Sequence, residues 1–151
     1  MSHAWGIALL RVTLGAIYVM HGYLGASVLG PAAVAQYVKR AGLPESFAEP
    51  WAWYVIIAHV VGGLMLIAGL WTALAALAQV PIIAGALFLI HLPQGFFMRG
   101  IITEAAAGRA IAGGYEFVLL VLAATITLVF TGAGALAVDG RGRYRSRFAK
   151  P

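Results

Sequence analysis

Four titratable side chains lie in or beside strongly apolar runs of this chain and could carry chemistry. They are His21, His59, His91 and Glu116. Imidazole exchanges protons near neutral pH, and a neighbouring carboxylate stabilises the protonated ring. Because ionisable groups are costly inside a membrane, they usually face the interior of a helix bundle and pair with one another. We therefore expect these side chains to gather in one site for proton exchange and hydrogen bonding.

Each of these residues also has a purely structural explanation. Glu116 follows two glycines in the first turn of a predicted helix, where free amides and the helix dipole favour a carboxylate. His91 would be an interfacial residue before Pro93, and His21 could bond to a backbone carbonyl in a packed core. Arg11 lies about 15 Å from His21 at helical rise, and we expect it to snorkel to the lipid headgroups.

Histidines from separate spans could instead hold a haem or a transition metal ion. Paired histidines on two helices would ligate a b-type haem. The sequence has no HExxH motif and its histidines are widely spaced, so haem and metal are the weaker alternatives. The chain contains no cysteine, which excludes disulfides, thiolate catalysis and thiol relays within it.

The composition indicates that the elements positioning these residues lie in a membrane. Of the 151 residues, 62% are hydrophobic and only 10% are charged, whereas about a quarter of a typical soluble domain is charged. Residues 50–98 contain no Asp, Glu, Lys or Arg. A helical crossing takes about 20 apolar residues, so this segment alone is long enough for two. The chain is predicted to be a polytopic integral membrane protein.

The apolar runs predict an all-α fold, a bundle of four transmembrane helices. The expected spans are residues 5–28, 51–70, 72–92 and 112–131. Residues 1–140 would form the transmembrane domain and the basic residues 141–151 a cytoplasmic tail, as the positive-inside rule suggests. An even number of spans also places the amino terminus in the cytoplasm. Arg11 interrupts the first apolar run and no Lys or Arg precedes it, so we expect a retained span rather than a signal peptide.

Helical spacing predicts which faces are buried, and it places the four titratable residues in the outer half of the bundle. Glu116 lies on the smaller and more polar face of its helix, which we expect to be buried. That face also carries Leu120, Ala123 and Thr127. His59 lies on a face that suits a close helix contact, because small residues let helices approach in lipid. That face also carries Gly62, Gly63 and Leu66.

Six short motifs follow one another between Leu9 and Gly140. They read LLRVTLGAIYVMHGYLGA, RAGLP, HVVGGLMLIAGLWT, LPQGFF, GGYEFVLL and GAGALAVDG. In order and spacing they resemble the DoxX family, whose members are small four-helix membrane proteins. A related type includes the membrane subunit of thiosulfate:quinone oxidoreductase. The resemblance therefore implies a multi-pass protein of a bacterial or archaeal inner membrane that works with a redox partner, often through quinone.

The chain departs from the pattern of that family at two positions. Where the family commonly has a lysine shortly after the HG motif, this chain reads YLGA. Where the family commonly has a glutamate just before the glycine pair of the second span, this chain has His59. Imidazole keeps a proton acceptor there but changes its charge, so the ligand or the partner would differ.

The polar cluster and the resemblance together predict a membrane subunit of a quinone-linked oxidoreductase. His21, His59 and Glu116 would exchange protons with the quinone oxygens, and electrons would come from a partner's cofactor. The ligand would also be bound by His91 and the aromatic residues Tyr18, Phe96, Phe97 and Tyr115. The alternatives are a non-catalytic structural or assembly protein and, with less support, a small-molecule transporter. We expect contact with lipid and a partner subunit, and the chain could form a homo-oligomer; the basic tail is explained without nucleic acid.

Overall fold

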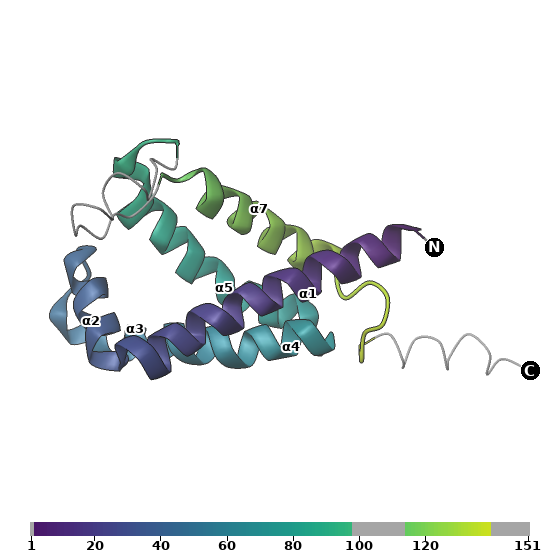
Figure 1. Cartoon of the computed structure of the whole chain (residues 1–151), viewed down its shortest axis with the longest axis horizontal. Helices are drawn as coiled ribbons and strands as arrows, with labels where there is room; N and C mark the ends of the chain where they lie inside the picture. The colour runs from purple at the N-terminus through teal and green to yellow at the C-terminus, as the bar shows by residue number, and fades with distance from the viewer. Residues whose placement is uncertain (1, 98–113, 140–151) are drawn as a thin grey trace, which may run out of the picture.

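The computed structural model describes residues 2–97 and 114–139, and the regular secondary structure in this part of the chain is helical (Figure 1). The first of three long rods consists of α1 (Ser2–Tyr23) and a π-helical segment (Leu24–Leu29). The second consists of α3 (Glu45–Ile57), a π-helical segment (Ala58–Gly62) and α4 (Gly63–Ala68). The third consists of α5 (Thr72–Gly85), a π-helical segment (Ala86–His91) and a 3-10 turn (Leu92–Gln94). Two further helices are α2 (Pro31–Arg40) and α7 (Glu116–Thr131).

Three helices are long and apolar enough to cross a membrane, by their length and composition. They are His3–Leu29, Glu45–Ala68 and Thr72–Gln94. The apolar helix α7 has 16 residues and is about 24 Å long, which is less than the roughly 30 Å core of a bilayer. The prediction of an all-α membrane protein is confirmed, while the crossing by residues 112–131 and the cytoplasmic termini stay predictions. Residues 112 and 113 and the basic tail lie outside the described residues.

The connection between the first two rods contains α2, a helix that the sequence analysis did not predict. Pro31 occupies its first turn, where a missing backbone N–H costs nothing. Val38 is buried while its neighbour Lys39 is exposed. The helix ends before Gly42, whose φ of 98° turns the chain towards α3. Since α3 starts at Glu45 rather than at residue 51, the second span is longer than predicted.

The two ends of the bundle differ in what lies there. Figure 1 shows α2 and the turn after the third rod at one end, which we call the α2 end. At the opposite end, the N–H of Ala135 donates to the carbonyl of Ala4 at 2.9 Å. The start of α1 and the segment after α7 therefore lie together there, and we call this the termini end.

The first and second rods pack backbone against backbone, as their small residues predicted. A Cβ added to Gly15 would lie 2.7 Å from the carbonyl oxygen of Gly63. A Cβ added to Gly63 would lie 2.8 Å from the carbonyl oxygen of Gly15. Such close approach maximises van der Waals contact where lipid supplies no hydrophobic drive between helices.

Arg11 is buried at the termini end, so the prediction that it snorkels to the headgroups was wrong. Its side chain is 1% exposed. Its guanidinium donates to backbone carbonyls of the second rod and of the segment after α7. These belong to Leu66, Ile67, Ala133, Ala135 and Leu136. The physical reason is that a planar group with five N–H donors can bond to several carbonyls at once where a helix ends and the chain turns, including that of Leu66, which also accepts from the N–H of Gly69 at 3.1 Å.

Asp139 completes the same end of the bundle by capping the third rod. Its carboxylate accepts hydrogen bonds from the backbone N–H of Trp71 at 2.8 Å and of Thr72 at 2.9 Å. The backbone N–H of Asp139 donates to the carbonyl of Gly69 at 2.9 Å. These bonds hold Trp71 at a φ of 45°, a left-handed conformation that is unfavourable for a bulky residue.

This cap predicts an acid-sensitive contribution to stability. Burial opposes ionisation of Asp139, but the N–H groups of Thr72 and Trp71 and the charge of Arg11 hold its pKa below the ordinary 3.8. When folding lowers the pKa of a carboxyl group, its full contribution to stability is present at pH values above its ordinary pKa. That contribution is lost as the pH falls through the lowered pKa. We expect Asp139→Asn to lower the unfolding free energy by about 1 kcal/mol at pH 7. Detergent-unfolding curves of the two proteins should converge below pH 3.8; a difference independent of pH would contradict the cap.

The buried face of α7 is not the predicted one. Val121, Thr125 and Leu128 are its buried residues, whereas Leu120 on the predicted face is 66% exposed. The polar Thr127 favours burial of the face that carries it. However, the hydroxyl of Thr127 donates to the carbonyl of Ala123 in its own helix, at 2.8 Å, so it needs no partner in the bundle.

Candidate functional site

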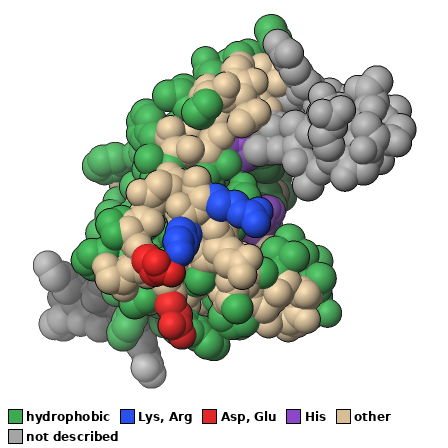
Figure 2. Space-filling view, turned by 90° about the vertical axis from the view of Figure 1, so that its left-hand side faces the viewer, with side chains coloured by type: hydrophobic (Ala, Val, Ile, Leu, Met, Phe, Trp, Pro, Cys, Tyr) green, Lys and Arg blue, Asp and Glu red, His purple; other side chains and the backbone are tan. Residues whose placement is uncertain are grey.

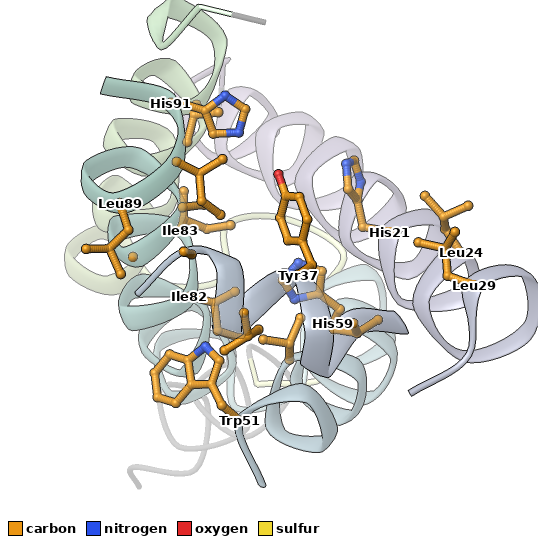
Figure 3. A pocket seen from close by; sticks show the side chains of 18 of the residues that line it. His21, Leu24, Leu29, Tyr37, Trp51, His59, Ile82, Ile83, Leu89 and His91 are labelled. Carbon is orange, nitrogen blue, oxygen red and sulfur yellow. The ribbon is translucent and has the colours of Figure 1, made fainter. Parts of the chain in front are cut away.

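A cavity of about 630 Å³ lies at the α2 end, between α2, the three rods and the first turns of α7. Its wall is mostly apolar, and Leu24, Ile82, Ile83 and Leu89 are among the side chains in Figure 3. The polar side chains of the wall are Tyr18, His21, Gln36, Tyr37, Arg40, His59 and His91. Small-molecule sites commonly have about 300–1,000 Å³ and this mixture of apolar walls with a few polar groups.

The structure brings three of the four predicted titratable residues to this one cavity, one from each rod. They are His21, His59 and His91. His59 lies inside the π-helical segment of its rod, and His91 is the last residue of another such segment. The rings of His21 and His59 have their centroids 6.3 Å apart, at 71° to each other. π-helical turns are rare and frequent at functional sites, and here they widen the helices where the cavity lies.

His21 is held by its own helix with one ring nitrogen engaged. Nδ1 lies 2.9 Å from the carbonyl oxygen of Ile17. Because a carbonyl only accepts, Nδ1 must carry the proton that it donates. In the neutral ring Nε2 is then an acceptor, and it has no partner among the described residues. His21 can therefore accept a hydrogen bond or a proton from a ligand.

His59 is the most buried of the three, with 6% of its surface exposed. The ring of Tyr18 packs against it with centroids 5.2 Å apart. Gln79, which is fully buried, donates from Nε2 to the carbonyl of Ala58 at 2.6 Å. Among the described residues, Nδ1 of His59 and Oε1 of Gln79 have no hydrogen-bond partner. Gln79 lies behind the wall, because it is not among the described residues that line the cavity, and its side chain interacts with that of His59. Its Oε1 can therefore accept a hydrogen bond from Nδ1 of His59 when that atom carries a proton.

Tyr18 joins the cavity to α7. Its side chain is 1% exposed, and its hydroxyl is hydrogen-bonded to the hydroxyl of Thr125. Thr125 in turn donates to the carbonyl of Val121 at 2.7 Å. These bonds satisfy buried polar groups between the first rod and α7, so the ring of Tyr18 is fixed where it lines the cavity.

Glu116 is the first residue of α7 and does not line the cavity among the described residues. Its backbone N–H donates to the carbonyl of Phe96 at 3.1 Å. Gly114 makes this approach possible, because a Cβ there would lie 2.3 Å from the carbonyl oxygen of Phe97. The next residue, Phe117, does line the cavity. Glu116 is therefore adjacent in sequence to a wall residue, and it occupies the first turn of α7, where the helix dipole favours a carboxylate.

The other predicted ligand-binding aromatics form a separate cluster beside Glu116. The ring of Phe96 contacts those of Phe97 and Tyr115, with centroids 5.2 Å apart in each pair. None of these three side chains is among the described residues of the cavity wall. The cluster instead ties the start of α7 to the turn after the third rod.

Four residues of the cavity wall and one residue behind it were not predicted from the sequence. The wall residues are Gln36, Tyr37, Arg40 and Trp51, and Gln79 lies behind His59. Only Gln79 gave a usable signal, since it is the one amide in the apolar stretch from Thr72 to Ile90. The others come from α2 and the start of α3, which the sequence analysis assigned to a connection or a span end.

The polar groups of the cavity can bind the oxygen atoms of an organic ligand. In the two described ranges, no three His, Cys, Asp or Glu side chains gather closely enough to hold a metal. The groups that line the cavity are imidazoles, phenols, an amide and a guanidinium. These hydrogen-bond to carbonyl, hydroxyl and carboxylate oxygens.

Comparison with known proteins agrees with the fold and with the motifs. The family model of DoxX matches residues 6–92, which is more than half of the chain. The match includes His21, His59 and His91 and the whole of α2. No curated protein and no solved structure matches the chain. The chain belongs to the DoxX family.

Proposed function

We propose that this chain is the membrane subunit of a quinone-linked oxidoreductase and that its cavity binds the quinone. One observation carries the proposal: three imidazoles from three separate rods line a single, largely apolar cavity of about 630 Å³. A quinone has a flat apolar ring with two carbonyl oxygens. It would bury the ring and the start of its tail against apolar side chains while the imidazoles bond to the oxygens.

In this proposal the histidines move protons and the partner subunit moves electrons. Reduction of a quinone takes two electrons and two protons. His21, with Nε2 available, and His59, inside the wall, would supply or accept the protons, since imidazole works on either side of neutral pH. Glu116 would act from the start of α7, beside the wall residue Phe117. The electrons would come from a cofactor of a partner bound to this subunit in a bacterial or archaeal inner membrane.

The proposal predicts that His59→Phe lowers both quinone affinity and quinone turnover. The substitution keeps an aromatic ring but removes the hydrogen bonds, so we expect about tenfold weaker binding of a short-chain quinone. Turnover by the complex isolated with its native partner should fall about 100-fold, because a proton-transfer group is lost. Binding is measured in nanodiscs by quenching of the fluorescence of Trp51, which lines the cavity.

His3→Phe is the matched control, because His3 is exposed and lies at the termini end of α1. It should leave binding and turnover at wild-type values. If His59→Phe binds quinone and turns over as the wild type does, the proposal is wrong. A different outcome is that His59→Phe yields less folded protein or less complex, while each complex that does form has normal turnover. The polar groups would then serve assembly rather than catalysis.

A further inference from the structure

The cavity has a polar rim that the proposed quinone site does not use. α2 contributes Gln36, Tyr37 and Arg40 to the wall. In the view of Figure 3, the ring of Tyr37 extends into the cavity and its hydroxyl lies between the rings of His21 and His91. α2 therefore does more than connect two rods: it closes one side of the cavity with hydrogen-bond donors.

Arg40 gives this rim a positive charge, and no carboxylate of the described residues pairs with it. The adjacent Lys39 is paired with Glu45, with Nζ and Oε1 2.6 Å apart, whereas in the described part of the chain Arg40 forms no ion pair. Figure 2 looks onto this end and shows the blue basic side chains beside the purple histidines, with the red carboxylates on the other side. A guanidinium at the edge of an apolar cavity attracts an oxyanion, which it can bind through two parallel hydrogen bonds.

We propose that α2 forms an oxyanion-binding rim and that the cavity accepts an acidic amphiphile, a molecule with one apolar chain and a carboxylate head. The apolar wall would bury the chain, while Arg40 and Tyr37 would bind the head. The phenol of Tyr37 is protonated at neutral pH and can donate a hydrogen bond to the head; partial burial raises its pKa further. The proposed quinone site takes its polar groups from the histidines and Glu116 and not from α2, so this inference does not rest on that proposal and adds a second class of ligand for the same cavity.

Trp51 in the cavity wall provides the test. The protein in zwitterionic nanodiscs is titrated with a brominated fatty acid and with the brominated alcohol of the same chain length. The quenching that disappears in a Trp51→Phe variant reports the cavity. We expect the acid to bind roughly tenfold more tightly than the alcohol, as one charged hydrogen bond implies. Arg40→Gln should abolish this preference, and the matched control Lys39→Gln should keep it.

Two results would overturn the inference directly. One is equal binding of the acid and the alcohol by the wild type. The other is a loss of preference in Lys39→Gln as large as in Arg40→Gln, which would mean a general effect of surface charge. Butyrate at the same concentration as the brominated acid should not displace it, because the short chain of butyrate buries little apolar surface. A short-chain quinone, measured on the same variants, should depend on His59 and not on Arg40, so the two proposals can fail separately.

Discussion

Arg11→Met is expected to cost the protein about 3 kcal/mol of unfolding free energy, because it removes the side-chain donor from several partly buried carbonyls. The guanidinium bonds to Ile67 at 2.7 Å and to Ala133 at 2.9 Å, besides three further carbonyls. With Arg11 only 1% exposed, little water can replace it. Methionine fills a similar volume, so the loss measures hydrogen bonds rather than a cavity. The measurement is unfolding in mixed micelles with increasing SDS, followed by circular dichroism.

Arg40→Met is the control for the change of an arginine to methionine. Arg40 is exposed on α2, and its replacement should change the unfolding free energy by less than about 0.5 kcal/mol. The loss of unfolding free energy in Arg11→Lys should lie between those of Arg11→Met and Arg40→Met, because an ammonium has three N–H donors and lacks the planar forked geometry of a guanidinium. Equal stability of Arg11→Met and the wild type would show that Arg11 does not hold the termini end together.

Gly15→Ala is expected to destabilise the bundle by about 1–3 kcal/mol, through a single added methyl group. That methyl would lie 2.7 Å from the carbonyl oxygen of Gly63 and 3.0 Å from the backbone nitrogen of Ile67. Backbone atoms of a helix cannot move aside individually, so the first and second rods must separate. The same unfolding measurement in mixed micelles detects the change.

Gly6→Ala in the same helix is the matched control. A Cβ on Gly6 would have no atom within 4 Å. Alanine is favoured over glycine within a helix by about 0.5–1 kcal/mol, so this variant should be as stable as the wild type or more stable. If the two alanine variants have the same stability, the close contact between the rods does not stabilise the fold.

The helices and the close contact between rods could be predicted because they depend on local sequence. Runs of apolar residues fix where helices lie in lipid, and small residues such as Gly15 and Gly63 fix where two helices can touch. α2 was not predicted because it is short and polar on one side, so its sequence from Pro31 to Arg40 has no long apolar run. The start of α3 was placed too late for a similar reason, because the helix begins at the charged residue Glu45, outside the apolar run.

The errors concern polar side chains whose partners are far away in sequence. The carbonyls bonded by Arg11 lie 55 to 125 residues from it, and no spacing rule predicts such bonds. Thr125 and Thr127 look alike in sequence, yet one is buried against Tyr18 and the other is satisfied within α7. The gathering of the histidines at one site was predicted, and His21, His59 and His91 do line one cavity, but the π-helical segments and the α2 wall that make the cavity were not predicted.

The central claim is that the histidines of the three rods bind a quinone within one cavity. It is tested most directly by photolabelling the protein in nanodiscs with an azido-quinone and mapping the labelled residues by mass spectrometry. We predict labels on wall residues around His21, Trp51 and His59, and their loss when excess unlabelled quinone is present. Labels confined to exposed apolar residues such as Leu9, Leu74 and Phe130, unaffected by unlabelled quinone, would contradict the account.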